Sequence, residues 1–262
     1  MSQADPPRLG RLYLVPTPLD FGCAVQSALS ESMPLHTITV AARLTHWISE
    51  NAKSTRAFLK RVNELQALSN PIQALHIQEL PHAVHKKGDH KSGQAVEFDA
   101  KALLAPAFQG IDIGLVSEAG MPAVADPGSS VVRAAHDLGL PVLPLVGPVS
   151  LLLALAASGL NGQDFAFVGY LPTDSDLRLQ RIRQLESLAL KTGQTQLFIE
   201  VPYRNMAMQQ ALLQGLQSNT RLSVSCGLSL PDAWTRSQTV KDWKKSPSRL
   251  DNATPAVFAL GR

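Results

Sequence analysis

The sequence predicts an α/β protein with two consecutive α/β domains, the first built on a mostly parallel sheet and the second on a mixed sheet. Short apolar runs alternate with stretches of helical period along the chain, which is the pattern of strand–helix units. The 262 residues exceed the ~150 residues of one average domain. Hydrophobic residues make up 45% of the chain and charged residues 17%, which supplies one or two apolar cores and excludes a disordered chain.

The first half of the chain contains three apolar runs that predict buried strands and two stretches with helical spacing. The strands are expected at Arg11–Val15, Ile111–Ser117 and Pro141–Leu145, and the helices at Lys53–Leu68 and Val131–Leu138. Pro16-Thr17-Pro18 ends the first strand in a rigid turn, and Gly139 stands where a helix C-terminal cap belongs.

The most apolar stretch of the chain, Leu143–Leu160, has roughly the length of a membrane span. Gly147-Pro148 interrupts it near its start and Gly159 near its end. The residues between them predict a buried core helix of about ten residues, and we expect no membrane segment.

The strand–helix pattern restarts after Gly162. Strands are expected at Phe165–Gly169, Thr195–Glu200, Arg221–Cys226 and Pro255–Leu260, and helices at Asp176–Leu190 and Arg204–Leu216. Because the gaps are longer and the predicted strands shorter than in the first half, we expect a mixed sheet here. The predicted domains are residues 1–146 and 147–262, with a hinge near Val146–Pro148.

Charge and composition exclude several classes of protein. Lys and Arg number 24 and Asp and Glu 21, and this net charge of +3 permits an anionic substrate without requiring nucleic acid. Cys23 and Cys226 are too few for a disulfide framework or a cysteine-ligated zinc site. The first residues contain no signal-peptide core, so we expect a cytoplasmic protein. The dinucleotide fingerprint, the P-loop and the serine nucleophile elbow are all missing from the sequence.

Four of the seven histidines gather around the polar stretch Leu80–Gly93. They are His76, His82, His85 and His90. Imidazole is the commonest metal ligand, but the spacing is irregular and the stretch predicts a loop. We expect a solvated loop and no metal site, with a basic loop that contacts the substrate as the alternative, because three lysines lie in the same stretch.

Two glycine- and proline-rich segments follow predicted strands. Gly114–Gly128 lies at the edge where open α/β sheets bind ligands, and its glycines let a ligand approach the main chain. Asp126 with Pro127-Gly128 is expected to cap the next helix. Ser150 stands in the first turn of the apolar helix, where free amides can bind a carboxylate. By themselves these segments are also consistent with structural crossovers; together with the turn at Pro16-Thr17-Pro18 they would form one cleft if the three strands are neighbours.

Several runs, in order over almost the whole chain, resemble the motifs of the tetrapyrrole methylase superfamily. They are Gly10–Pro18, Leu115–Pro122, Asp126–Gly128, Gly147-Pro148, Ala157–Leu160 and Gly169–Pro172, with Glu200–Arg204 similar to the family's Glu-Ser-Pro-His-Arg. Within the superfamily the chain most resembles the ribosomal RNA small-subunit methyltransferase I branch, which methylates a cytidine ribose 2′-hydroxyl.

The resemblance implies S-adenosylmethionine bound in a cleft between two α/β domains, S-adenosylhomocysteine as the product, and a homodimer. In the N-terminal part it implies cofactor contacts by Pro18, Leu19, Ser117, Gly120, Met121, Pro122, Val124, Ala125, Ser150 and Leu151. In the C-terminal part it implies contacts by Ile199, Cys226, Gly227 and Pro255. Most of these contacts would be main-chain or apolar, which suits a neutral adenosyl group.

The chain departs from the branch at charged positions that concern the substrate. Glu50 and Arg56 remain, but Asn51 replaces the aspartate of the acidic Asp-Thr-Arg motif. Ser225–Leu230 lacks the Arg, Glu and Lys of the branch's Ala-Arg-Glu-Leu-Thr-Lys, and Asn252–Thr254 replaces Lys-Gly-Glu.

The leading hypothesis is a methyltransferase that transfers the methyl group of S-adenosylmethionine to an oxygen or other nucleophile, and the resemblance implies RNA as one candidate substrate. The alternatives are a methylase of a tetrapyrrole or other small molecule, and a non-catalytic paralogue that binds S-adenosylmethionine or RNA. The expected substrate contacts are Lys53, Arg56 and Arg204. The candidates for a catalytic base are Glu50, Glu118 and Glu200, each of which also fits a structural role.

Overall fold

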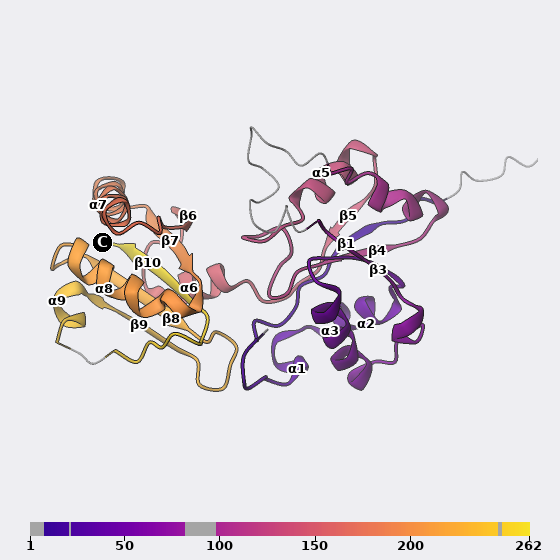
Figure 1. Ribbon diagram of the computed structural model, residues 1–262, viewed down its shortest axis with the longest axis horizontal. Coiled ribbons are helices and arrows are strands. Elements are labelled where there is room, and N and C mark those ends of the chain that lie inside the picture. The colour runs from indigo at the N-terminus through magenta and orange to yellow at the C-terminus, as the bar shows by residue number, and fades with distance from the viewer. Residues whose placement is uncertain (1–7, 21, 82–97, 246–247) are drawn as a thin grey trace, which may run out of the picture. The chain divides into compact units, whose positions relative to one another are not determined.

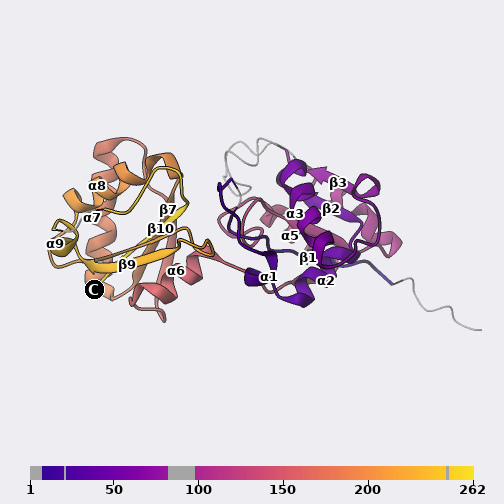
Figure 2. The ribbon, with the colours of Figure 1, turned by 90° about the horizontal axis from the view of Figure 1, so that it is seen from below.

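The computed structural model describes residues 8–20, 22–81, 98–245 and 248–262 (Figures 1 and 2). The chain divides into two compact units, which we call unit 1 (residues 1–21 and 28–148) and unit 2 (residues 22–27 and 149–262). Each unit contains a five-stranded sheet. Two α/β units, one with a parallel sheet and one with a mixed sheet, confirm the predicted fold class, while the exact domain limits of 1–146 and 147–262 stay a prediction.

The sheet of unit 1 has the strand order β3-β2-β4-β1-β5, and all its pairings are parallel. The strands are β1 (Leu12–Leu14), β2 (His46–Ser49), β3 (His76–Glu79), β4 (Ile113–Val116) and β5 (Val142–Pro144). Since parallel strands end at the same edge, the loops after β1, β2, β4 and β5 all leave from one side of the sheet.

Helices cover both faces of the parallel sheet. They are α1 (Leu29–Ser32), α2 (Leu35–Arg43), α3 (Ala52–Leu65), η1 (Ile72–Ala74), η2 (Ala102–Gln109) and α5 (Ser129–Asp137). One core cluster joins α2 and α3 to Trp47, and a second joins η2 and α5 to Ile48. Trp47 and Ile48 are consecutive in β2 and point to opposite faces, so the sheet is buried on both sides.

The sheet of unit 2 has the order β6-β7-β10-β8-β9, with β6 and β7 parallel and the other pairings antiparallel. The strands are β6 (Phe165–Tyr170), β7 (Thr195–Glu200), β8 (Arg221–Cys226), β9 (Trp234–Thr239) and β10 (Ala256–Gly261). The mixed sheet was predicted, but the expectation of shorter strands was wrong, because each strand here has 6 residues and those of unit 1 have 3 or 4.

The helices of unit 2 are α6 (Ser150–Ser158), α7 (Ser175–Thr192), η3 (Pro202–Arg204), α8 (Asn205–Gly215) and α9 (Val240–Trp243). α7 and α8 pack on the face that holds Phe198 and Phe258, whose rings stack 5.7 Å apart. α6 packs on the opposite face and ends at Gly159, which has a left-handed φ of 68°. Within the part of the chain that the structure describes, no helix is long and apolar enough to cross a membrane.

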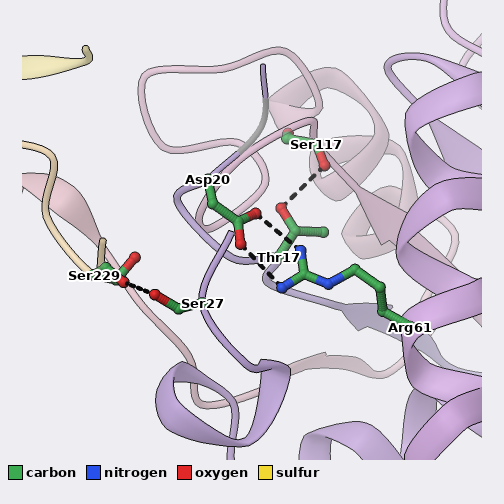
Figure 3. Close-up of polar contacts among 6 residues, drawn as sticks. All are labelled: Thr17, Asp20, Ser27, Arg61, Ser117 and Ser229. Carbon is green, nitrogen blue, oxygen red and sulfur yellow. Dashed lines mark hydrogen bonds and ion pairs between the residues drawn. The ribbon is translucent and has the colours of Figure 1, made fainter. Parts of the chain in front are cut away.

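The short segment 22–27 belongs to unit 2, although both of its flanks belong to unit 1. The Ser27 hydroxyl donates a hydrogen bond of 2.6 Å to the carbonyl oxygen of Ser229 (Figure 3). Ser229 itself has a left-handed φ of 68°. This six-residue segment therefore anchors on the turn that follows β8.

One predicted detail is wrong. α5 begins at Ser129, and its N-cap residue is Gly128, with a φ of 129°. Asp126 therefore does not cap this helix. Glycine adopts this positive φ readily, so Gly128 takes the N-cap position and Asp126 lies two residues before it.

Candidate functional site

In unit 1, the turn after β1 is joined to the loop after β4. The Thr17 amide donates to the Gly120 carbonyl oxygen at 2.9 Å, and the Gly120 amide donates back to the Thr17 carbonyl oxygen at 3.0 Å. The buried Thr17 hydroxyl also donates to the Ser117 carbonyl oxygen at 3.3 Å (Figure 3). These contacts bring Pro18 beside the Ser117–Gly120 segment.

Glycine is required where three loops of unit 1 meet. Gly120 has a φ of 77°, and a Cβ added there would lie 3.1 Å from the Leu19 side chain and 3.6 Å from the Pro148 carbonyl oxygen. A Cβ on Gly147 would lie only 2.3 Å from Pro16. The loops after β1, β4 and β5 therefore touch at one edge of the sheet through main chain and apolar groups.

The loop after β4 has an unusual backbone. Ala123 and Ala125 both have a φ of 64°, in the left-handed region that non-glycine residues seldom adopt. Such conformations cost of the order of 1–3 kcal/mol each and gather at functional sites. Between them Val124 is 41% exposed, and its amide donates to the Met121 carbonyl oxygen at 3.3 Å. The loop thus exposes Val124 and Ala125 to solvent, in a backbone conformation that is strained at Ala123 and Ala125.

Two carboxyl groups of unit 1, those of Glu50 and Glu118, act on a third, that of Asp126. The Glu118 amide donates to Oε2 of Glu50 at 3.2 Å, so the structure brings together two candidates for a catalytic base. Asp126 has its pKa raised to about 7, first by burial and then by repulsion from Glu50 and Glu118. Asp126 was missed as a titrating residue, because the sequence does not show that its loop returns toward Glu50.

Helix α3 carries two of the predicted substrate contacts. Lys53 and Arg56 are exposed in its first turns. Asn51, the residue that departs from the branch, caps the helix, because its side chain accepts hydrogen bonds from the Lys53 amide at 2.9 Å and the Ser54 amide at 3.3 Å. Asparagine and aspartate both cap helices, so the replacement of the branch's aspartate by Asn51 is compatible with an unchanged start of α3.

In unit 2, the four predicted cofactor residues gather at one end of the sheet. Ile199 pairs with Val257 in the register of β7 and β10. The Gly227 amide donates to the Pro255 carbonyl oxygen at 2.9 Å, directly after Cys226 at the end of β8. Burial, followed by Asp251 and Cys23, raises the pKa of the Cys226 thiol to about 11. The thiol is therefore protonated at neutral pH, and it packs in the apolar cluster under α7 and α8.

Helix α6, which begins with Ser150 and Leu151, lies on the face of this sheet that holds Ile199, opposite the face on which Cys226 packs. Leu151 is buried in one cluster with Val257, and Ile199 packs against that cluster. The N-cap of α6 is Val149, and among the described residues no side chain caps the helix. The first amides of α6 are thus open to an acceptor from outside the helix.

Two further predicted residues, Glu200 and Arg204, pair with each other. Their side chains form an ion pair at 3.2 Å, and Glu200 is nearly buried. Oε1 of Glu200 accepts a hydrogen bond from the Val201 amide at 2.9 Å, and Arg204 donates to the Thr173 hydroxyl at 3.3 Å. These contacts favour a structural role for both residues over the predicted catalytic and substrate-binding roles.

Of the four predicted loop histidines, only His76 lies among the described residues. It is in β3 and stacks on His46 with the ring centroids 4.5 Å apart. Burial and then His76 lower the pKa of His46. His82, His85 and His90 lie outside the described residues. Over residues 8–20, 22–81, 98–245 and 248–262, no group of His, Cys, Asp and Glu is placed to hold a metal ion.

Comparison with crystal structures identifies the class of fold. The chain superposes on the methyltransferase CobJ with a TM-score of 0.54 and 13% identity, over 97% of this chain and 94% of that one. It superposes on uroporphyrin-III-C-methyltransferase from Thermus thermophilus with a TM-score of 0.51 and 16% identity, over 96% and 94% of the two chains. The fold is that of the tetrapyrrole methyltransferases.

Sequence comparison narrows the resemblance. The chain is 32% identical over 206 residues to ribosomal RNA small subunit methyltransferase I of Vibrio cholerae, covering 78% of this chain and 60% of that protein. It is 38% identical over 155 residues to the protein of the same name from Pseudomonas aeruginosa, covering 58% and 54%. The matches thus span less than two thirds of these relatives, and no family model matches the chain. The predicted sequence resemblance to ribosomal RNA small subunit methyltransferase I is confirmed, and the fold matches that of tetrapyrrole methyltransferases.

Proposed function

We propose that this chain is an S-adenosylmethionine-dependent methyltransferase. The observation that carries the proposal is the meeting of three loops of unit 1 at the carboxyl edge of a parallel sheet, through the Thr17–Gly120 bridge and the close approach of Gly147 to Pro16. Ligands of open α/β sheets bind at this edge. The main-chain and apolar character of the loops fits an adenosyl group, which needs close backbone approach more than charge.

We propose donor contacts for each unit by itself. In unit 1 they are Pro18, Leu19, Ser117, Gly120, Met121, Pro122, Val124 and Ala125. In unit 2 they are Ser150, Leu151, Ile199, Cys226, Gly227 and Pro255. The uncapped start of α6 supports this assignment, since it offers amides to a donor carboxylate.

The bound donor would supply a methyl group on a sulfonium centre, and methyl transfer requires position and exclusion of water before it requires a base. The chain's part is to orient the accepting atom and to take up its proton. Asp126 is the acid–base candidate, because its pKa of about 7 lies near neutral pH. Glu50 and Glu118 would act through it, by keeping that pKa high.

For the substrate we propose the ribose 2′-hydroxyl of an RNA, by analogy with the named relatives, in a cytoplasmic homodimer. Lys53 and Arg56 are exposed on α3 and would bind phosphates. Arg204 is paired with Glu200, which leaves fewer cations for RNA than the sequence predicts. That pairing favours the second candidate function, methylation of a small molecule.

The decisive experiment measures release of S-adenosylhomocysteine on addition of fractionated RNA and, separately, of porphyrinoids. We expect release with RNA and none with porphyrinoids. Release with porphyrinoids alone would establish the small-molecule function. Calorimetry that detects donor binding, together with no release from either addition, would identify a non-catalytic paralogue; absence of donor binding would refute the proposal.

A further inference from the structure

A buried ion pair fixes the turn after β1 to helix α3. Nη1 of Arg61 lies 2.9 Å from Oδ1 of Asp20, and Nη2 of Arg61 lies 2.9 Å from Oδ2 of Asp20 (Figure 3). The Asp20 side chain is 4% exposed and that of Arg61 19%. The contact is thus bidentate, with two parallel hydrogen bonds, and nearly closed to water.

Stability alone does not account for such a pair. Removing two charges from water costs several kcal/mol for each ion, and their attraction in the interior offsets this cost only when the geometry is good. An apolar pair of similar volume would stabilise a fold as well or better. The parallel bonds of an arginine and a carboxylate instead specify position and orientation.

The position that the pair specifies is the second half of the donor turn. Other contacts fix the first half of this turn: Thr17 is hydrogen-bonded to Gly120, and Pro16 lies against Gly147. Leu19, the neighbour of Asp20, has its side chain over Gly120. A displacement of the Asp20 carboxylate would therefore move Leu19 across the main chain that the donor approaches.

Arg61 lies on the helix that also carries the exposed cations Lys53 and Arg56. We propose that Asp20 and Arg61 are positioning residues, whose ion pair sets the donor turn in register with this basic helix. The inference rests on the proposed function and adds two residues that touch neither donor nor substrate. Misplacement of a binding group by about 1 Å can cost up to about 100-fold in rate, which is the scale of effect a positioning pair can have.

The test measures the Kd of S-adenosylmethionine by calorimetry, and kcat and the KM of S-adenosylmethionine with the RNA that supports turnover, in Arg61→Gln, Asp20→Asn and Arg61→Lys. We expect the first two variants to bind the donor about ten-fold more weakly and to raise its KM more than they lower kcat. Arg61→Lys keeps the charge but loses the second parallel hydrogen bond. Its affinity for the donor should therefore lie between those of the wild type and of Arg61→Gln.

A matched control is the ion pair of Arg43 and Asp112, at 2.9 Å in the same unit, which lies away from the donor turn. Arg43→Gln should lower the melting temperature and leave donor affinity unchanged. The double variant Asp20→Asn/Arg61→Gln removes both buried charges, so it should regain melting temperature over the single variants while donor affinity stays low.

Three results would overturn the inference: donor affinity that returns together with stability in the double variant, single variants that bind the donor like the wild type, or an equal loss in the Arg43 control. Absence of donor binding by the wild-type protein would instead refute the proposed function itself, and the inference with it.

Discussion

Asp126 of unit 1 and Asp251 of unit 2 are residues of the same type in loops beside proposed donor residues, and their pKa values move in opposite directions. Burial, Glu50 and Glu118 raise the pKa of Asp126 to about 7. Burial also acts to raise the pKa of Asp251, but hydrogen bonds from the Ala253 and Thr254 amides and the Thr254 hydroxyl outweigh it and lower the pKa.

The difference extends to the backbone of the two regions. The loop of unit 1 contains two alanines in the left-handed region and the Asp126 carboxyl group, which forms no ion pair within the part of the chain that the structure describes. The corresponding end of unit 2 is rich in internal bonds: Asn205, which is fully buried, donates to the carbonyl oxygens of Asp251 and Thr254 at 3.1 and 2.8 Å. Strain and displaced pKa values mark sites of chemistry more often than satisfied networks do. Unit 2 has a left-handed residue of its own, Ser229, and a raised pKa at Cys226, but that thiol stays protonated at neutral pH, whereas Asp126 has a pKa of about 7. We therefore propose that the chemistry takes place in unit 1 and that unit 2 serves binding and support.

The largest effect is expected from Met121→Arg in the strained loop of unit 1. A guanidinium among apolar and main-chain groups should lower the affinity for S-adenosylmethionine by at least about 100-fold, because its charge and volume oppose burial of the adenosyl group. Calorimetry measures the change. Met206→Arg in unit 2, at a side chain that is 43% exposed, serves as the control and should bind normally. A folded Met121→Arg protein with unchanged affinity would remove the loop from the donor site.

A large effect of a different kind is expected from Glu186→Ala in unit 2. The buried Glu186 carboxylate accepts hydrogen bonds from the Thr220 hydroxyl at 2.5 Å and the Gln217 amide at 2.7 Å. Loss of this acceptor should lower the free energy of unfolding by about 2–3 kcal/mol, measured by urea denaturation, and leave donor affinity intact. Glu186→Gln keeps an acceptor and should lose less. Weaker donor binding in a folded variant would contradict a purely structural network.

An intermediate effect follows from the opposite pKa directions of the two aspartates. The pKa of Asp126 in the folded protein lies above its ordinary value of 3.8, so its contribution to stability is present below about pH 4 and is lost as the pH rises to about 7. Asp126→Asn should therefore raise stability at pH 8, by about 1–2 kcal/mol, and change it little at pH 4.

Asp251→Asn is the matched comparison, and its effect on stability should have the opposite sign. The lowered pKa of Asp251 gives stability that is present above its ordinary value and is lost as the pH falls. This variant should therefore be less stable than the wild type at neutral pH, and the difference should shrink in acid. Melting temperatures across pH 3–9 measure both variants. Shifts of the same sign for the two aspartates would refute the contrast between the loops.

The smallest effect is expected for RNA binding by unit 1. Each phosphate contact with a single strand adds about 0.7 to the slope of log affinity against log salt. Lys53→Ala/Arg56→Ala should reduce that slope by about two contacts and leave donor affinity unchanged. Arg183→Ala/Lys191→Ala, at exposed positions of α7 in unit 2, is the control and should keep the slope. Tight RNA binding with the same salt dependence in the α3 variant would move the RNA site away from this helix.

The sequence predicted elements well where apolar runs are bounded by polar residues. β7 and β8 have the predicted limits, Thr195–Glu200 and Arg221–Cys226. β2, β3 and β9 were missed. β2 offers only two apolar residues, Trp47 and Ile48, while β3 and β9 are edge strands, which need no apolar run: β3 is largely exposed, and all six residues of β9 are half-buried. Tertiary pairing, rather than local hydrophobicity, makes these segments strands.

The candidate site was predictable only in its main-chain parts. Glycine and proline after a strand indicate a ligand-binding loop, and the Thr17–Gly120 bridge joins two such loops. The Asp20–Arg61 pair has no sequence pattern, since its partners are 41 residues apart. The left-handed Ala123 and Ala125 were equally hidden, because alanine does not signal that conformation. Long-range pairs and strain arise from the assembled fold and are not encoded by a local motif.

The membership of residues 22–27 in unit 2 affects how the protein can be made and divided. Translation completes Ser27 202 residues before Ser229, the residue whose carbonyl it bonds. A nascent chain can therefore close the parallel sheet of unit 1 long before this segment meets its acceptor, so the final docking is a late step in synthesis. For the same reason a single cut after Pro148 leaves the C-terminal fragment without residues 22–27 of its unit, and the N-terminal fragment, which carries them, can supply the segment when it is added back in trans.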